Sequence, residues 1–171
     1  MSIYNVGYFG SISNAYCLDI LNEIAPNLSP EKFQFHICGK VDENGSGIDS
    51  KIQYHGYLSG SAFVSFCNKI DIFINPRSYS SEISDYSFPS KIYEYMSYCR
   101  PIVSTPLGHV SDKTSRFITF STDFSSNAVM TCLMDVKKDY SHYLLKARAH
   151  KDYLNELNVG KKIYNFLEGI D

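Results

Sequence analysis

The chain has 171 residues, enough for one domain with a sizeable core. Its hydrophobic fraction of 44% and charged fraction of 20% are ordinary for a globular protein, and the net charge of −2 excludes a nucleic-acid binder that uses a broad basic surface. The sequence contains no apolar run near the roughly 20 residues of a membrane span, and its first residues do not resemble a signal peptide. We therefore expect a cytoplasmic protein.

In the first half of the chain, short apolar runs that stop at turn residues alternate with runs of helical spacing. The short runs predict strands, and the longer ones predict helices that start at capping residues or stop before proline. The predicted strands are 5–10, 33–39 and 52–57. The predicted helices are 15–25, ending before Pro26, and 59–68, with Ser59 or Ser61 as cap.

The second half continues the alternation. Apolar runs at 71–76, 100–105 and 117–120 predict strands. A helix is expected to start near Pro89, and two more helices are expected at 124–136 and 140–167, the last with a break around 158–160. This pattern predicts an α/β fold with a Rossmann-like open parallel sheet of about six strands, helices on both faces and strand order 3-2-1-4-5-6. Residues 1–171 form a single domain in this interpretation, with 139–171 packing back on it as a helical segment.

Ligands of such sheets bind at the carboxyl ends of the strands. Gly10, Gly39, Asn75-Pro76 and Thr105-Pro106 all lie at the carboxyl ends of predicted strands, so we expect the loops there to form one crevice. The start of the helix near Pro89 lies at the same edge.

The stretch 85–96 is the most informative part of the sequence. Ser87 is placed as the N-cap of a helix and Pro89 in its first turn, where free backbone N–H groups and the helix dipole suit phosphate. Lys91 is unfavourable for that dipole, and a bound anion would offset the misfit. Glu94, one turn further, can accept hydrogen bonds from sugar hydroxyls. The alternative is an ordinary capped helix with a surface lysine and glutamate.

Several other site types receive no support. The dinucleotide fingerprint G-x-G-x-x-G and the Walker phosphate loop are absent, and no Ser-His-Asp order stands out. His36 alternates with apolar residues and is interpreted as a structural strand residue, whereas His55 is either structural or part of the crevice. The five cysteines are widely spaced, which favours free buried thiols in a reducing compartment over a zinc site.

The run 87–103, with Ser87-Phe88-Pro89-Ser90-Lys91, Glu94 and Arg100-Pro101-Ile102-Val103, resembles a known family. It looks like the C-terminal, donor-binding half of a GT-B glycosyltransferase, most similar to glycosyltransferase family 4 (glycosyl transferases group 1). The segments 6–10, 35–39 and 52–58 resemble the first three strands of that domain. The resemblance covers roughly residues 4–136, and the helical tail fits as well.

The resemblance implies roles for particular residues. Glu94 matches the glutamate that holds the donor ribose, and the amides around Pro89, Ser90 and Lys91 match the helix start that holds the diphosphate. Tyr57 and Leu58 match the segment that lines the base. The candidate donor-binding set is Gly10, Ser11, Gly39, Lys40, Tyr57, Leu58, Arg77, Tyr86, Ser87, Phe88, Pro89, Ser90, Lys91 and Glu94. The sequence assigns no catalytic residue.

Two departures from the family pattern matter. The first glutamate of the family's motif falls on Tyr86, which affects the handling of the donor sugar. The loop after the first strand, residues 10–15, lacks the arginine and lysine that usually neutralise the diphosphate. We expect Arg77 and Lys91 to supply that charge from the other side of the crevice.

These observations predict a hexosyltransferase half that binds a UDP- or GDP-sugar, without a metal or another cofactor. The intact retaining enzyme would build a polysaccharide or glycolipid, with a missing N-terminal domain for the acceptor and peripheral association with a membrane. The isolated domain is then expected to be inactive. The alternative is a non-catalytic nucleotide-binding module or degenerate donor domain. A flavodoxin-like or response-regulator domain is disfavoured because residues 10–12 provide neither an acidic nor a phosphate-binding loop.

Overall fold

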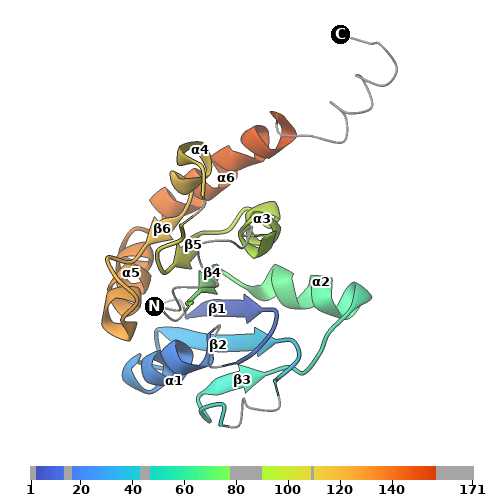
Figure 1. The fold of residues 1–171 in the computed structure, drawn as a ribbon, viewed down its shortest axis with the longest axis vertical. Helices are drawn as coiled ribbons and strands as arrows, with labels where there is room; N and C mark the ends of the chain where they lie inside the picture. Colours follow the sequence, from blue (N-terminus) through green and yellow to red (C-terminus); the bar gives the residue numbers. More distant parts are fainter. Residues whose placement is uncertain (1–2, 14–16, 43–46, 78–89, 109, 157–171) are drawn as a thin grey trace.

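The computed structural model describes residues 3–13, 17–42, 47–77, 90–108 and 110–156, with side chains up to residue 150. Its centre is a parallel sheet of six strands in the order β3-β2-β1-β4-β5-β6 (Figure 1). The predicted Rossmann-like α/β fold and the predicted strand order are therefore confirmed. The strands are β1 (Tyr4–Phe9), β2 (Phe33–Cys38), β3 (Ile52–Tyr54), β4 (Ile72–Asn75), β5 (Ile102–Ser104) and β6 (Thr119–Phe120).

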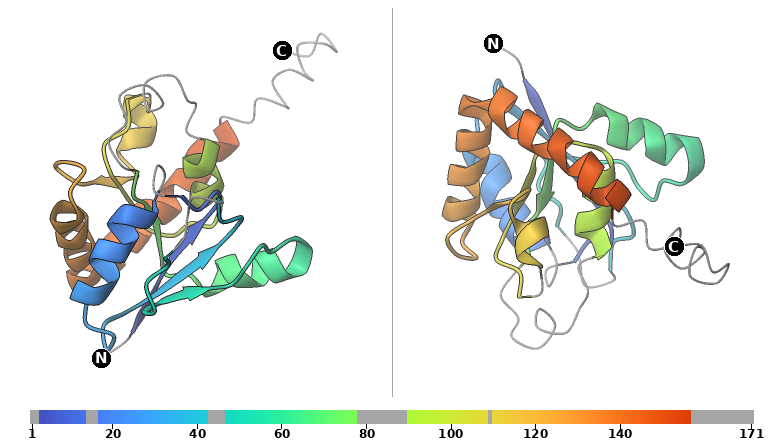
Figure 2. Two further views of the ribbon diagram at one scale, coloured as in Figure 1. Left: turned by 60° about the horizontal axis from the view of Figure 1, so that its bottom comes forward. Right: turned by 90° about the horizontal axis from the view of Figure 1, so that it is seen from above.

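The helices lie on both faces of this sheet (Figures 1 and 2). They are α1 (Leu18–Asn27), α2 (Gly60–Lys69), α3 (Ser90–Ser97), α4 (Asp112–Ser115), α5 (Ser126–Lys138) and α6 (Tyr140–Glu156). Each long helix lies close to its predicted position. The short α4 is not predicted, because its four residues are too few to show an apolar period.

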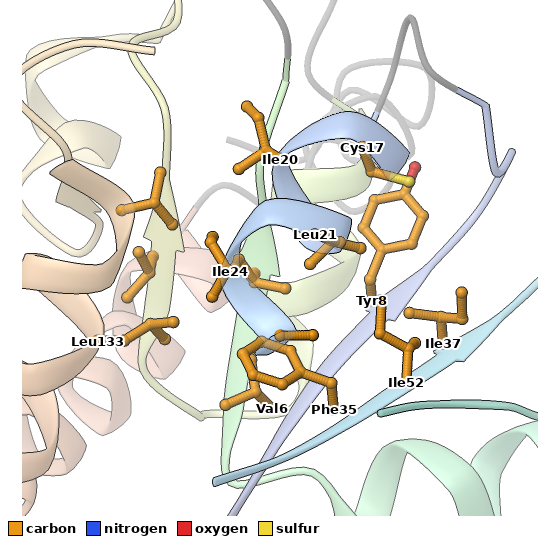
Figure 3. Close-up of a cluster of buried hydrophobic side chains, with 14 of the residues drawn as sticks. Val6, Tyr8, Cys17, Ile20, Leu21, Ile24, Phe35, Ile37, Ile52 and Leu133 are labelled. Atoms are coloured by element: carbon orange, nitrogen blue, oxygen red, sulfur yellow. The ribbon is translucent and has the colours of Figure 1, made fainter. Parts of the chain in front are cut away.

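Alternate residues of the strands supply two hydrophobic cores, one on each side of the sheet. The first core packs α1 and α5 against β1 and β2, with Val6, Leu21, Phe35 and Leu133 among its buried residues (Figure 3). The second core packs α2 and α3 against the opposite face and contains Phe73 and Tyr95, whose rings stack with centroids 4.7 Å apart. The two cores fix the sheet on both sides, so its carboxyl edge is a rigid base for the loops that follow the strands.

Helix α6 crosses from the side of α5 to that of α3 (Figure 2, right). The Tyr140 hydroxyl donates to the Asp71 carbonyl oxygen at 3.1 Å, and Ala147 is buried. The buried His150 hydrogen-bonds through Nε2 to the Met96 carbonyl oxygen of α3. Residues 140–150 therefore contact the strands and helices described above. The single domain with a helical segment at 139–171 stays a prediction, and the predicted break at 158–160 lies outside the described residues.

Some predicted boundaries are wrong. Helix α1 continues past Pro26 to Asn27. Pro26 lies in the last turn, where its missing N–H costs only one backbone hydrogen bond, and the next turn still closes because the Leu28 N–H donates to the Ile24 carbonyl oxygen at 3.2 Å. The third strand ends at Tyr54 rather than Tyr57, and the chain then turns at Gly56 with a φ of +70°. All five cysteines are free, and Cys17, Cys38 and Cys67 are buried. The two others, Cys99 and Cys132, are only half-buried, which corrects that part of the prediction.

Candidate functional site

A cavity of about 480 Å³ opens at the carboxyl ends of β1 and β2. It lies where ligands bind in open parallel sheets, beside the change in strand order between β1 and β4. Six residues predicted from the sequence line it. The full lining is Phe9, Gly10, Ser11, Cys38, Gly39, Lys40, Tyr57, Leu58, Ser59 and Phe63. We call it the glycine-edge cavity.

Gly10 and Gly39 allow the backbones of two loops to meet at this cavity. Both have a positive φ, +136° and +142° respectively, which disfavours any residue with a side chain. A Cβ atom at Gly39 would lie 1.8 Å from the Gly10 carbonyl oxygen. The Ile12 N–H donates to the Lys40 carbonyl oxygen at 2.9 Å and holds the loops in register. The two glycines therefore make a close, side-chain-free rim that a ligand can approach.

The remaining wall is aromatic and apolar. The rings of Phe9 and Phe63 meet edge to face with centroids 4.9 Å apart. Tyr57 is 68% exposed, and Lys40 Nζ lies 5.6 Å from the centre of its ring. Leu58 is half-buried against the same core as Phe63. A planar, apolar ring with polar edges fits such a wall, because it can stack on an exposed aromatic ring while backbone groups bind its edges.

Lys91 lies beside the glycine rim, although its helix packs on the other face of the sheet from Tyr8. Its Nζ atom donates to the Tyr8 hydroxyl at 2.6 Å and lies 4.2 Å from the centre of that ring. A Cβ atom at Gly10 would lie 2.5 Å from Nζ. The pKa of Lys91 is lowered to about 8, mainly by burial and to a smaller extent by the charge of Arg77.

Arg77 follows β4 at the same edge. Its backbone N–H donates to Thr105 Oγ1 at 2.9 Å, which ties the end of β4 to the end of β5. Its charge also contributes to lowering the pKa of Lys91 and opposes the rise that burial causes in the pKa of Tyr8. The structure thus brings Arg77 and Lys91 into one electrostatic environment, and their joint role at a diphosphate stays a prediction.

The rest of the predicted set is placed less completely. Ser90 is the exposed first residue of α3, and Glu94 is exposed one turn later. Glu94 is not among the residues that line the glycine-edge cavity, and neither are Lys91 and Arg77. Its carboxylate contributes to raising the pKa of Tyr98 and Cys67, although burial is the main cause for both. The predictions for Tyr86, Ser87, Phe88 and Pro89 lie outside the described residues.

A second cavity, of about 580 Å³, lies between α2 and the β1–β3 part of the sheet. Its lining includes His36 and His55, whose rings stack with Nδ1 of His36 and Nε2 of His55 3.1 Å apart. His36 Nε2 bonds Asn5 Oδ1 at 3.1 Å, and Asn5 Nδ2 donates to Asp71 Oδ2 at 3.3 Å. We call it the histidine cavity. His55 therefore lines a different cavity from the predicted crevice.

Five residues near the glycine-edge cavity were not predicted to belong to the site. Phe9 and Cys38 end the strands just before the two glycines, so their position next to Gly10 and Gly39 was a usable signal. Ser59 and Phe63 follow Leu58 at helical spacing. Tyr8 had no usable signal, because its contact with Lys91 joins residues 83 positions apart.

The described residues do not contain three His, Cys, Asp or Glu side chains grouped so that they could hold a metal ion. Within the same described part, each helix is too short or too polar to cross a bilayer. The predictions of no metal and no cofactor stay predictions.

Solved structures resemble this fold. An Anabaena protein, Alr3699/HepE, in complex with UDP and glucose superposes with a TM-score of 0.75 at 13% identity, covering 98% of this chain and 49% of that one. The C-terminal domain of a glycosyl transferase group 1 family protein (LpcC) from Francisella tularensis gives a TM-score of 0.66 at 17% identity, covering 90% and 85%. WaaG, a glycosyltransferase involved in lipopolysaccharide biosynthesis, gives 0.66 at 11% identity, covering 88% and 43%. At these identities the likeness shows the fold.

The chain spans about half the length of the Anabaena protein. A search of curated proteins found no match. The family model for glycosyl transferases group 1, in contrast, matches residues 3–132, which is most of the chain. This match covers all six strands, the glycine rim and the helix that carries Lys91. The chain therefore belongs to the glycosyl transferases group 1 family.

Proposed function

We propose that this chain is the donor-binding half of a glycosyltransferase and that the glycine-edge cavity holds a nucleoside diphosphate sugar. The observation that carries the proposal is the close rim of Gly10 and Gly39 with the charged end of Lys91 against it. The rim has no side chain that would keep a phosphate away from the backbone, and Lys91 supplies positive charge. The aromatic wall of Tyr57 and Phe63 suits the base.

The comparisons support a uridine donor over a guanosine donor. The Anabaena protein has been solved with UDP and with UDP-glucose, and it covers nearly the whole of this chain. We therefore propose a UDP-hexose as the first donor to test and a GDP-sugar as the second. The retaining outcome and the polysaccharide or glycolipid acceptor belong to the same proposal, and the lipopolysaccharide role of WaaG supports the acceptor class.

The proposed chemistry divides between two domains. In this chain, Lys91 and Arg77 stabilise the negative charge that develops on the leaving diphosphate, and the start of α3 adds the positive end of its dipole. These groups take the part that a cation would otherwise have, so we propose a metal-independent reaction. A second domain would hold the acceptor hydroxyl, and this chain alone would not turn over.

The second candidate function is nucleotide binding without catalysis. It is favoured by the loop after β1, where Gly10, Ser11 and Ile12 offer no basic side chain to the diphosphate. Transfer of a labelled hexose by the full-length protein, compared with this chain alone, separates the two functions. Multiple turnovers by the isolated chain would contradict the proposed division between domains.

Calorimetric titration of this chain with UDP, GDP, UDP-glucose and UMP tests the proposal. We expect saturable binding with a preference for diphosphates over the monophosphate. Glu94→Ala should then weaken UDP binding about tenfold to a hundredfold if Glu94 holds the ribose, because a charged hydrogen-bond partner is lost. No binding of any of these nucleotides would refute the proposed function.

A further inference from the structure

The hydroxyl of Tyr8 is a fixed hydrogen-bonding point beneath the glycine rim. Tyr8 is 1% exposed and packs in the first core with α1. Its hydroxyl donates to the Ser11 carbonyl oxygen at 2.7 Å. A phenol has one proton, so the oxygen can meet other partners only as an acceptor. The Cys17 thiol lies against the same hydroxyl (Figure 3).

Lys91 donates a hydrogen bond to the Tyr8 hydroxyl oxygen. Its ammonium donates to the Tyr8 hydroxyl at 2.6 Å and lies above the face of the same ring, 4.2 Å from the centre. Both contacts favour the charged lysine. A lysine side chain normally samples many rotamers, and these contacts hold its charged end at one place. That place is beside Gly10, at the rim of the cavity.

The chemistry of this anchor suits an anion site. A carboxylate would hold the ammonium equally well, but it would cancel the positive charge. A neutral phenol holds it without cancelling the charge. An ammonium has three N–H groups, so two remain for other acceptors after the bond to Tyr8. The nearby charge of Arg77 adds to the positive potential at the same point.

We infer that Tyr8 is a positioning residue that holds Lys91 at the glycine rim, so that its ammonium binds the outer phosphate of a nucleoside diphosphate. The inference rests on the proposed function. Lys91, held by Tyr8, would then supply one of the phosphate-binding cations that the loop after β1 lacks. Tyr8 acts through Lys91 and does not itself touch the nucleotide.

The test compares UDP with UMP, because only the diphosphate reaches the outer phosphate position. Tyr8→Phe should reduce UDP affinity about tenfold and leave UMP affinity nearly unchanged, since a hydrogen bond to a charged group is lost. The matched control is Tyr140→Phe, which removes a tyrosine hydroxyl that bonds the Asp71 carbonyl at 3.1 Å and lies away from the cavity. The control should keep the wild-type ratio of UDP to UMP affinity.

A double-mutant cycle separates positioning from general destabilisation. Lys91→Met should reduce the UDP to UMP affinity ratio, and adding Tyr8→Phe to it should reduce that ratio no further. An unchanged ratio in Tyr8→Phe, or equal losses for the two nucleotides, would overturn the inference. Wild-type protein that binds neither nucleotide would instead refute the proposed function and the inference with it.

A second measurement needs no variant. In 15N-labelled wild-type protein, the Lys91 ammonium should give a slowly exchanging 1H–15N signal, because a hydrogen-bonded ammonium exchanges more slowly than a hydrated one. That signal should shift on addition of UDP and much less on addition of UMP. An ammonium that exchanges as fast as those of exposed lysines would overturn the inference even if Tyr8→Phe fails to fold.

Discussion

The glycine-edge cavity and the histidine cavity differ in where they lie on the sheet and in what their polar groups contact. The histidine cavity is the larger, at about 580 Å³ against about 480 Å³. Three of its polar side chains, those of Asn5, His36 and His55, form one hydrogen-bonded chain. Asn5 Oδ1 can only accept, so His36 Nε2 donates to it, and neutral His36 then accepts from His55 through Nδ1. The Asn5 side-chain amide in turn donates to the Asp71 carboxylate.

Beside the glycine-edge cavity, the Lys91 ammonium has two N–H groups beyond its bond to Tyr8. The N–H groups of the rim are already used, because Gly10 donates to the Cys38 carbonyl oxygen and Gly39 to that of Gly56. The cavity also lies at the carboxyl ends of parallel strands, whereas the histidine cavity lies against the face of the sheet that α2 covers. Position at the carboxyl ends of the strands, rather than volume, distinguishes the candidate site.

The largest expected effect comes from filling the glycine rim. Gly39→Ala should lower the free energy of unfolding by about 3 kcal/mol or more, because its Cβ would overlap the Gly10 carbonyl oxygen at an unfavourable φ. Gly56→Ala is the control, since Gly56 has a positive φ but open space around it, and about 1–2 kcal/mol is expected there. Urea unfolding measures the free energy of unfolding of both variants. Equal losses in the two would show that the close approach of Gly39 to the Gly10 carbonyl oxygen does not add to the cost of the substitution.

The next effect contrasts Lys91, which lies beside the glycine rim, with a lysine of the histidine cavity. Lys91→Met should weaken UDP binding about tenfold to a hundredfold, because the diphosphate loses a charged hydrogen bond. Lys69→Met is the matched control, because Lys69 is exposed and lines the histidine cavity. Calorimetry should find its UDP affinity unchanged. A similar loss in both variants would place the nucleotide elsewhere or indicate a long-range charge effect.

A third effect follows from the pKa of Lys91, which burial lowers from 10.5 to about 8. UDP affinity should fall by up to tenfold per pH unit above pH 8, as the ammonium loses its proton, until the total loss equals that of Lys91→Met. The free energy of unfolding of the nucleotide-free protein should rise with pH between pH 8 and pH 10.5, because the unfolded chain binds more protons than the folded one in that range. Burial lowers the pKa of His36 and His55, so these two titrate below this window. Lys91→Arg should flatten the affinity profile, and a profile that stays steep would assign the titration to another group.

The smallest effect is expected in the histidine cavity. His55→Ala removes one exposed hydrogen bond to His36, so the free energy of unfolding should fall by about 1 kcal/mol or less. UDP affinity should not change, because the side chain lies outside the glycine-edge cavity. Calorimetry and urea unfolding on one preparation give both values. A tenfold loss of UDP affinity would contradict the separation of the two cavities.

The sequence predicts features that depend on neighbouring residues. The apolar runs that end at Gly10 and Gly39 predict two strands and a crevice at their carboxyl ends, and the family resemblance adds Tyr57 and Leu58 to the predicted lining. Contacts between distant segments were not predictable. Tyr8 and Lys91 meet across 83 positions, and the pairing of His36 with His55 depends on the register of β2 and β3. The predicted end of the first helix before Pro26 is wrong, because a proline near the end of a helix does not have to stop it.

The central claim is that a nucleoside diphosphate binds at the glycine rim and not in the histidine cavity. Titration of 15N-labelled protein with UDP, followed by amide chemical shifts, tests it most directly. We expect the largest changes at Gly10, Ser11, Gly39 and Lys40, with His36 and Gln53 unchanged. Saturable changes centred on His36 and Gln53, with the rim amides unmoved, would contradict the claim.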